Sequence, residues 1–198
     1  MATSSIKTGM TPARLLGGRY NTGGTTAYAV ANAYGTAIFK GDPVKLSAGY
    51  IVRGGGTDTT AIGVARGFFY MDSTNYGKPR FTDQLPASTS TYNSQSIDGF
   101  SSPVAYVVDD PDATFYIQAD ATVSVADVGA YYQVSIGAGS TITGISGARL
   151  NVSSKSTTST DRLVKVIGLA KLPGNAWNQA SGTVVEVRFV GHQNAGTN

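Results

Sequence analysis

The hydrophobic residues of the chain occur in short runs that turn-forming residues separate. Ten of these runs predict strands, at 26–31, 36–39, 44–46, 50–53, 61–71, 104–108, 114–119, 131–136, 163–172 and 183–190. Ten short strands in one domain are typical of a β-barrel or a β-sandwich. We therefore predict an all-β fold, a single β-barrel or β-sandwich domain with short antiparallel strands and long loops.

The clearest alternation of polar and apolar residues lies at 183–190. Val185, Val187 and Phe189 occupy every second position, which predicts a half-buried antiparallel strand with these three side chains facing inward. The alternation at 163–172 is weaker, and Gly168 within it predicts a bulge or a close backbone approach. The sequence Lys-Gly-Asp-Pro at 40–43 predicts a sharp bend between two apolar runs.

Other parts of the chain lack a sustained pattern. Two long polar stretches, 83–100 and 136–160, are predicted to be loops and candidate contact surfaces. A single helical turn is predicted near 124–128, where Ser124 could cap it. Residues 1–24 show neither strand nor helix periodicity, so we predict an extended N-terminal arm at 1–24, the β domain at 25–191 and a C-terminal tail at 192–198.

The amino-acid composition supports the strand assignment and narrows the range of possible functions. Only 14% of residues are charged, the chain has 25 glycines, and Glu186 is its single glutamate, whereas exposed helix faces are normally rich in Glu, Lys and Arg. The absence of cysteine excludes disulfides, thiolate nucleophiles and Cys-bound metals. The net charge of +3 comes without a dense Lys/Arg cluster, so we expect no nucleic-acid partner. No apolar run suits a signal peptide or a membrane span, so we expect no membrane partner.

Candidate catalytic groups are scarce. His192 is the only histidine, and its place near the C-terminus predicts a solvated terminal residue better than a catalytic relay or a metal ligand. The acidic group at 109–112 lacks the alternate spacing of a calcium loop, and its Asp and Pro residues favour a tight turn between two strands. We therefore expect no catalytic residue, no metal and no cofactor, and predict that the protein is not an enzyme.

Three segments, in this order and at this spacing, carry a resemblance to a known family. They are AIFKGDPV at 37–44, AIGVARG at 61–67 and DDPDATFYIQAD at 109–120. Together they resemble the head decoration, or cement, proteins of tailed bacteriophages, over about half of the chain, 37–134. The resemblance implies a β-rich, non-enzymatic virion structural protein that binds the outer surface of the capsid. It implies the major capsid protein as partner, a homotrimer, and a location on the capsid exterior after synthesis in the host cytoplasm.

The arm is the predicted anchor of such a protein. Its spaced apolar and basic residues could occupy pockets and meet carboxylates on a neighbouring subunit. The candidate contact residues are Ile6, Arg14, Leu15, Leu16, Arg19 and Tyr20, with Met10 as a further spaced hydrophobe. An alternative is a carbohydrate-binding or adhesive β module of a phage or bacterial surface, in which Tyr131, Tyr132 and Trp177 would form an aromatic face.

Overall fold

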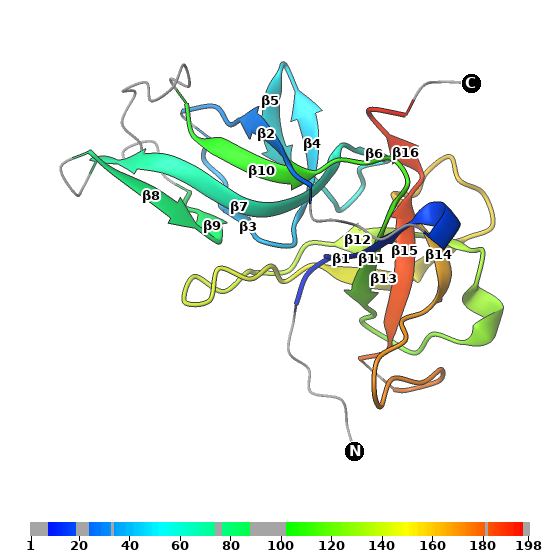
Figure 1. Cartoon of the computed structure of the whole chain (residues 1–198). Coiled ribbons are helices and arrows are strands. Elements are labelled where there is room, and N and C mark those ends of the chain that lie inside the picture. The colour runs from blue at the N-terminus through cyan, green and yellow to red at the C-terminus, as the bar shows by residue number, and fades with distance from the viewer. Residues whose placement is uncertain are drawn as a thin grey trace.

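The computed structural model describes residues 8–18, 24–32, 34–73, 77–87, 102–180 and 182–195. Most of the elements among these residues are strands (Figure 1). Two short 3-10 turns, η1 (Leu16–Gly18) and η3 (Val125–Asp127), also lie within the described ranges. The all-β prediction is confirmed. The predicted turn at 124–128 is also confirmed as η3, in which Ser124 and Asp127 form a capping box.

The first large sheet, called sheet A, contains the C-terminal strands. Its order is β1-β11-β15-β14-β12-β13, and every pairing in it is antiparallel. The bounds are β1 (Thr11–Leu15), β11 (Ala113–Gln118), β12 (Tyr131–Ser135), β13 (Arg149–Ser156), β14 (Val164–Leu169) and β15 (Val184–Phe189). The sheet curls, because an isolated bridge joins Ala119 after β11 to Leu150 in β13. In the described part of the chain this contact does not close the sheet into a barrel.

The second large sheet, called sheet B, has the order β2-β10-β7-β4-β5, with β8 paired to β7. The bounds are β2 (Thr26–Ala29), β4 (Pro43–Ser47), β5 (Tyr50–Arg53), β7 (Gly63–Asp72), β8 (Lys78–Thr82) and β10 (Val104–Val108). Two small pairs complete the fold. The strands β3 (Ile38–Phe39) and β9 (Gln84–Leu85) pair antiparallel, and β6 (Thr60–Ala61) and β16 (Gly191–His192) pair parallel.

Each large sheet has its own hydrophobic core. Val185, Val187 and Phe189 face the core of sheet A, as the alternation at 183–190 predicts. The predicted irregularity at Gly168 is confirmed by a register shift between β14 and β15. The core of sheet B lies around Phe68, Ile51 and Leu85, among other buried residues. Val64 and Val108, from the ends of β7 and β10, belong to the core of sheet A, so the two sheets meet at this point.

Asp42, in the bend between β3 and β4, ties this junction together. Gly41 has the left-handed backbone that the bend requires, with φ 92°, and its N–H donates to Ala65 O at 2.8 Å. The Asp42 carboxylate is completely buried and accepts hydrogen bonds from Phe39 N at 2.9 Å and from Ser146 Oγ at 2.5 Å. It also forms an ion pair with Arg53. The predicted bend is therefore confirmed, and its carboxylate links the bend to the loop that precedes β13.

The structure also corrects several predictions. β13 lies within the stretch 136–160 that was predicted to be a loop, and β1 lies within the arm that was predicted to form no element. Both are edge strands whose mixed exposure hides the alternation expected of a strand. Of the predicted loop 83–100, β9 is described, whereas 88–100 lies outside the described residues.

The predicted turn at 109–112 is confirmed, but with a different role. Ala113 N donates to Asp110 O at 3.0 Å, and Asp112 N donates to Asp110 Oδ1 at 2.8 Å. The strands on either side do not pair with each other, because β10 belongs to sheet B and β11 to sheet A. The turn is thus a crossover between sheets.

Candidate functional site

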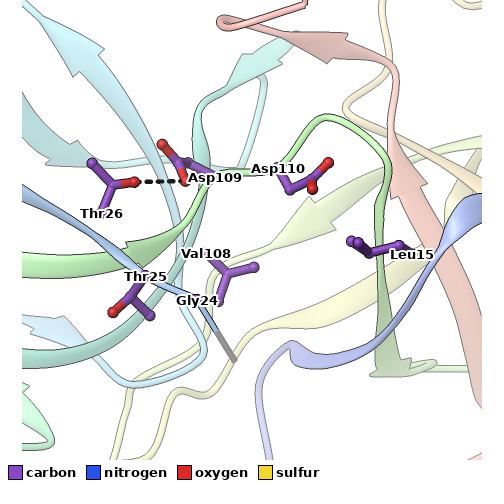
Figure 2. A pocket seen from close by; sticks show the side chains of 7 residues that line it. All are labelled: Leu15, Gly24, Thr25, Thr26, Val108, Asp109 and Asp110. Atoms are coloured by element: carbon purple, nitrogen blue, oxygen red, sulfur yellow. Dashed lines mark hydrogen bonds between the residues drawn. The ribbon is translucent and has the colours of Figure 1, made fainter. Parts of the chain in front are cut away.

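The described part of the predicted arm lies along the edge of sheet A, between two surface hollows. The junction hollow has a volume of about 280 Å³ and is lined by Leu15, Gly24, Thr25, Thr26, Val108, Asp109 and Asp110 (Figure 2). The cationic hollow has a volume of about 290 Å³ and is lined by Leu16, Val128, Gly129, Lys165, Val166, Ile167 and Arg188. Successive residues of the arm, Leu15 and Leu16, thus contribute to different hollows.

Arg14 is held by its own chain. Its Nε lies 2.8 Å from Glu186 Oε1, and its Nη2 donates to Glu186 Oε2 at 3.3 Å. The pairing of β1 with β11 places Arg14 there, and Thr114 Oγ donates to Arg14 O at 2.9 Å. The structure therefore places Arg14 in an ion pair within its own chain, while a contact of this side chain, which is 44% exposed, with a carboxylate of the shell stays a prediction. The ion pair explains why the Glu186 side chain is only 9% exposed.

The apolar arm residues also contact their own chain. Met10 is completely buried in the core of sheet A, and Leu15 is half-buried against that core. The burial of Met10 within its own chain contradicts the expectation that it fills a pocket on a neighbouring subunit, whereas the contact expected of Leu15 stays a prediction. Leu16 is half-buried beside the cationic hollow. The other predicted contact residues, Ile6, Arg19 and Tyr20, lie outside the described residues.

The carboxylates of the junction hollow are engaged in local hydrogen bonds. Asp109 accepts from Thr26 Oγ1 at 3.0 Å and from the Tyr28 hydroxyl at 2.7 Å. Burial and the bond to Asp109 both raise the pKa of Tyr28, although Asn194 opposes them. Figure 2 shows the Asp109 and Asp110 side chains diverging, with Asp109 directed at Thr26. Within the described ranges, no group of three or more acidic or histidine side chains is arranged to hold a metal ion.

His192 corrects the prediction of a solvated terminal residue. It is only 8% exposed, since the parallel pairing of β16 with β6 anchors this end of the chain. Its ring lies 6.4 Å from the Phe189 ring, centroid to centroid, and its Nδ1 accepts from Asn194 N at 3.1 Å. Burial lowers the pKa of His192, against the opposing effect of Asp109 and Asp110.

The aromatic face proposed for a carbohydrate-binding module does not form. Tyr132 is completely buried, and its hydroxyl donates to Asp127 Oδ1 at 2.9 Å. Tyr131 points to the opposite face of sheet A, where Lys165 Nζ lies 5.2 Å from its ring centroid. Trp177 is half-buried against the core of sheet A. The three rings therefore share no surface, which removes the sequence feature that supported this alternative.

A different aromatic surface lies on sheet B, and the sequence analysis missed it. Phe81 of β8 is 68% exposed, and its ring lies 5.4 Å from that of Tyr106 in β10. Phe69 of β7 stands directly opposite Phe81 in the sheet, and the Phe81 ring covers the backbone of Gly67, which has no side chain. We call Phe69, Phe81 and Tyr106 the aromatic face. The alternation in Lys-Pro-Arg-Phe-Thr at 78–82 is a signal that could have identified β8.

The three segments that carry the family resemblance lie together in the fold. Val44 stands opposite Gly63, and Val64 stands opposite Val108, which directly precedes the third segment. The segments therefore build the junction between the sheets rather than an exposed surface. Comparisons with protein-family models, curated proteins and solved structures found no match to the chain. No helix among the described residues is both long and apolar enough to cross a membrane.

Proposed function

We propose that this protein is a non-enzymatic structural protein of the virion that binds the outer surface of a tailed-phage capsid and stabilises the shell. The observation that carries the proposal is the aromatic face of sheet B. Exposed clusters of large apolar side chains are typical of protein-binding surfaces, whose centres are rich in Phe and Tyr and poor in charge. The resemblance of the junction segments to decoration proteins supports the capsid as the surface that is bound.

The geometry of the aromatic face suits contact with another protein. The Phe81 ring packs against Tyr106 and lies over Gly67, so part of its side-chain freedom is already lost before binding. Its exposed fraction of 68% leaves most of its apolar area available to a partner. Burying such a ring at the centre of an interface contributes on the order of 2 kcal/mol.

The mechanism is mechanical rather than chemical. A protein that contacts two neighbouring capsid subunits adds interface area across the seam between them, so a pressure that separates the subunits must also break this contact. Many copies on one shell act together, which makes weak individual contacts effective. A homotrimer, which the family resemblance implies, would place three such contacts around one point of the shell.

The test uses purified shells that lack this protein. The full-length protein should co-sediment with them at micromolar concentration, and Phe81→Ala should weaken binding about 30-fold, the equivalent of 2 kcal/mol. Ile142→Ala is the matched control, because it removes an apolar side chain that is 95% exposed in a turn between β12 and β13, away from the aromatic face. Failure of the unaltered protein to bind shells contradicts the proposed function. Unchanged binding by Phe81→Ala contradicts the role of the aromatic face, and monomers alone in light scattering contradict the trimer.

A further inference from the structure

Two cations stand directly opposite each other on the outer face of sheet A. Lys165 of β14 and Arg188 of β15 are register partners, and directly opposed residues of an antiparallel pair share one face. Like charges in this relation destabilise a sheet. The nearby carboxylate on this face is Glu186, and both of its oxygens are occupied by Arg14. Among the described residues, no carboxylate forms an ion pair with Lys165 or Arg188. The face therefore carries two positive charges without a counter-charge.

These cations border an apolar depression. The cationic hollow lies where η1 and the turn after η3 approach β14 and β15, a region that Figure 1 shows at one side of sheet A. Its apolar walls include Leu16, Val128 and Ile167, and Val128 is 44% exposed. The volume of about 290 Å³ equals that of about ten water molecules, enough for an aliphatic side chain with part of its backbone. The chain thus provides an apolar pocket beside paired positive charges.

We propose that the cationic hollow binds a segment of the partner protein that places an aliphatic side chain next to an Asp or Glu carboxylate. The aliphatic group displaces water from the walls, and the carboxylate pairs with Arg188 at the edge of the hollow, which Lys165 also lines. Arg188 is exposed, so its guanidinium can turn to form two parallel hydrogen bonds with the carboxylate. Lys165, whose Nζ lies 5.2 Å from the ring centroid of Tyr131, supplies a second positive charge at the same hollow.

This choice of partner follows from the charge and the lining together. A phosphate backbone would match the cations but would leave the walls of the hollow in contact with water, whereas an acidic and aliphatic peptide uses both features. In naming the capsid subunit as the source of that peptide, the inference rests on the proposed function. The chemistry of the hollow itself can be tested without capsids.

The first test measures peptide binding to the full-length protein by ¹⁵N-resolved NMR. The probes are acetyl-Leu-Glu-Leu-amide and its neutral counterpart, acetyl-Leu-Gln-Leu-amide. We expect the acidic peptide to shift the amide signals of Leu16, Gly129 and Ile167, and to bind at least tenfold more tightly than the neutral one. Its affinity should fall as salt is added, because screening weakens attraction between exposed charges. Equal affinity for both peptides, or shifts confined to other residues, would overturn the inference.

The second test uses the double variant Lys165→Gln with Arg188→Gln. It should lose the preference for the acidic peptide, whereas Lys171→Gln, which removes an exposed cation elsewhere, should retain it. The double variant should remain folded with a similar melting temperature, since relief of the repulsion between the two cations opposes the loss of the contact between Lys165 and Tyr131. A folded double variant that still prefers the acidic peptide contradicts the inference. Tighter binding of oligothymidylate than of the acidic peptide, with the same shifted residues, would also overturn it.

Shell binding separates this inference from the proposed function. If the unaltered protein binds shells and prefers the acidic peptide, and the double variant binds shells at least tenfold more weakly, both proposals are supported. If shell binding is unchanged in the double variant, the capsid segment is not the occupant and the inference fails, while the proposed function stands. If the unaltered protein prefers the acidic peptide but does not bind shells, the proposed function fails. The inference that the cationic hollow binds an acidic and aliphatic peptide then still stands.

Discussion

Replacing Arg53 with Met should strongly destabilise the junction between the sheets. Arg53 Nη2 donates to Asp42 Oδ1 at 3.1 Å and to Gly137 O at 3.0 Å. Arg53 Nε lies 2.7 Å from Asp42 Oδ2 as an ion pair, without the alignment of a hydrogen bond. Met keeps much of the side-chain volume and its contact with Phe39, over whose ring the guanidinium lies, but removes the positive charge. The variant therefore tests the charge rather than the packing.

The magnitude follows from the burial of the pair. The side chains of Asp42 and Arg53 are 0% and 15% exposed, so water cannot replace the lost guanidinium. Removing one partner of a buried ion pair costs about 3 to 5 kcal/mol. Because Ser146 Oγ and Phe39 N still donate hydrogen bonds to the Asp42 carboxylate, we expect a loss of stability near the lower end of this range, about 3 kcal/mol.

The pH dependence of the Arg53→Met variant provides a second readout. Burial already raises the pKa of Asp42 in the intact protein, although Ser146, Arg53 and Phe39 N oppose it. Without Arg53 that pKa rises further. A folded-state pKa above the unfolded value stabilises the protein at low pH, and this stabilisation is lost as the pH rises through the folded pKa. The loss of stability caused by Arg53→Met should therefore be larger at pH 7 than at pH 5.

Urea denaturation at both pH values measures these effects, with an unchanged m-value as the check on two-state unfolding. Adding Asp42→Asn to Arg53→Met should recover part of the loss at pH 7 and remove the additional pH dependence. The partly exposed pair Lys40–Asp83, at 3.0 Å, is the control, and Asp83→Asn should cost less than about 1 kcal/mol. The reasoning is refuted if Arg53→Met also costs less than about 1 kcal/mol, or if Asp42→Asn restores nothing.

Two further predictions concern buried titratable groups. Burial raises the pKa of Asp127, but bonds from Lys155, Ser124 and Tyr132 outweigh it and lower the pKa to about 2, so Asp127→Asn should cost about 2 kcal/mol at pH 7. In acid denaturation, the difference in stability between the Asp127→Asn variant and the unaltered protein should disappear as the pH falls from about 4 to 2. A difference that does not change with pH would contradict this prediction. Because burial lowers the pKa of His192, the folded protein should lose stability as the pH falls below the unfolded value of about 6.5. In chemical denaturation, His192→Ala should lower the free energy of unfolding at pH 7 by about 1 to 3 kcal/mol and make it less sensitive to this pH change. An unchanged free energy of unfolding would show that His192 is solvated.

The strands that the sequence predicted best are those whose pattern is local. Val185, Val187 and Phe189 alternate within a single strand between two neighbours, so the period of two is visible without knowledge of those neighbours. β1 and β13 lie at the edges of sheet A, and their partners impose the strand conformation. In β1, Pro12 and a register shift interrupt the pattern further. A window of sequence cannot contain its partner β11, which lies about a hundred residues away.

The same argument applies to the candidate contacts. Arg14 seemed available because its partner, Glu186, is 172 residues away, and only the register of β1, β11 and β15 brings the two together. Conversely, Lys165 and Arg188 each follow an apolar residue in an ordinary alternating strand, and nothing in the sequence shows that they become neighbours. A charged side chain is available to a partner only if the fold leaves it without a counter-charge. In a chain with so few charges, pairing within the sheets therefore distinguishes Arg14, which forms an ion pair with Glu186, from Lys165 and Arg188, which stand opposite each other.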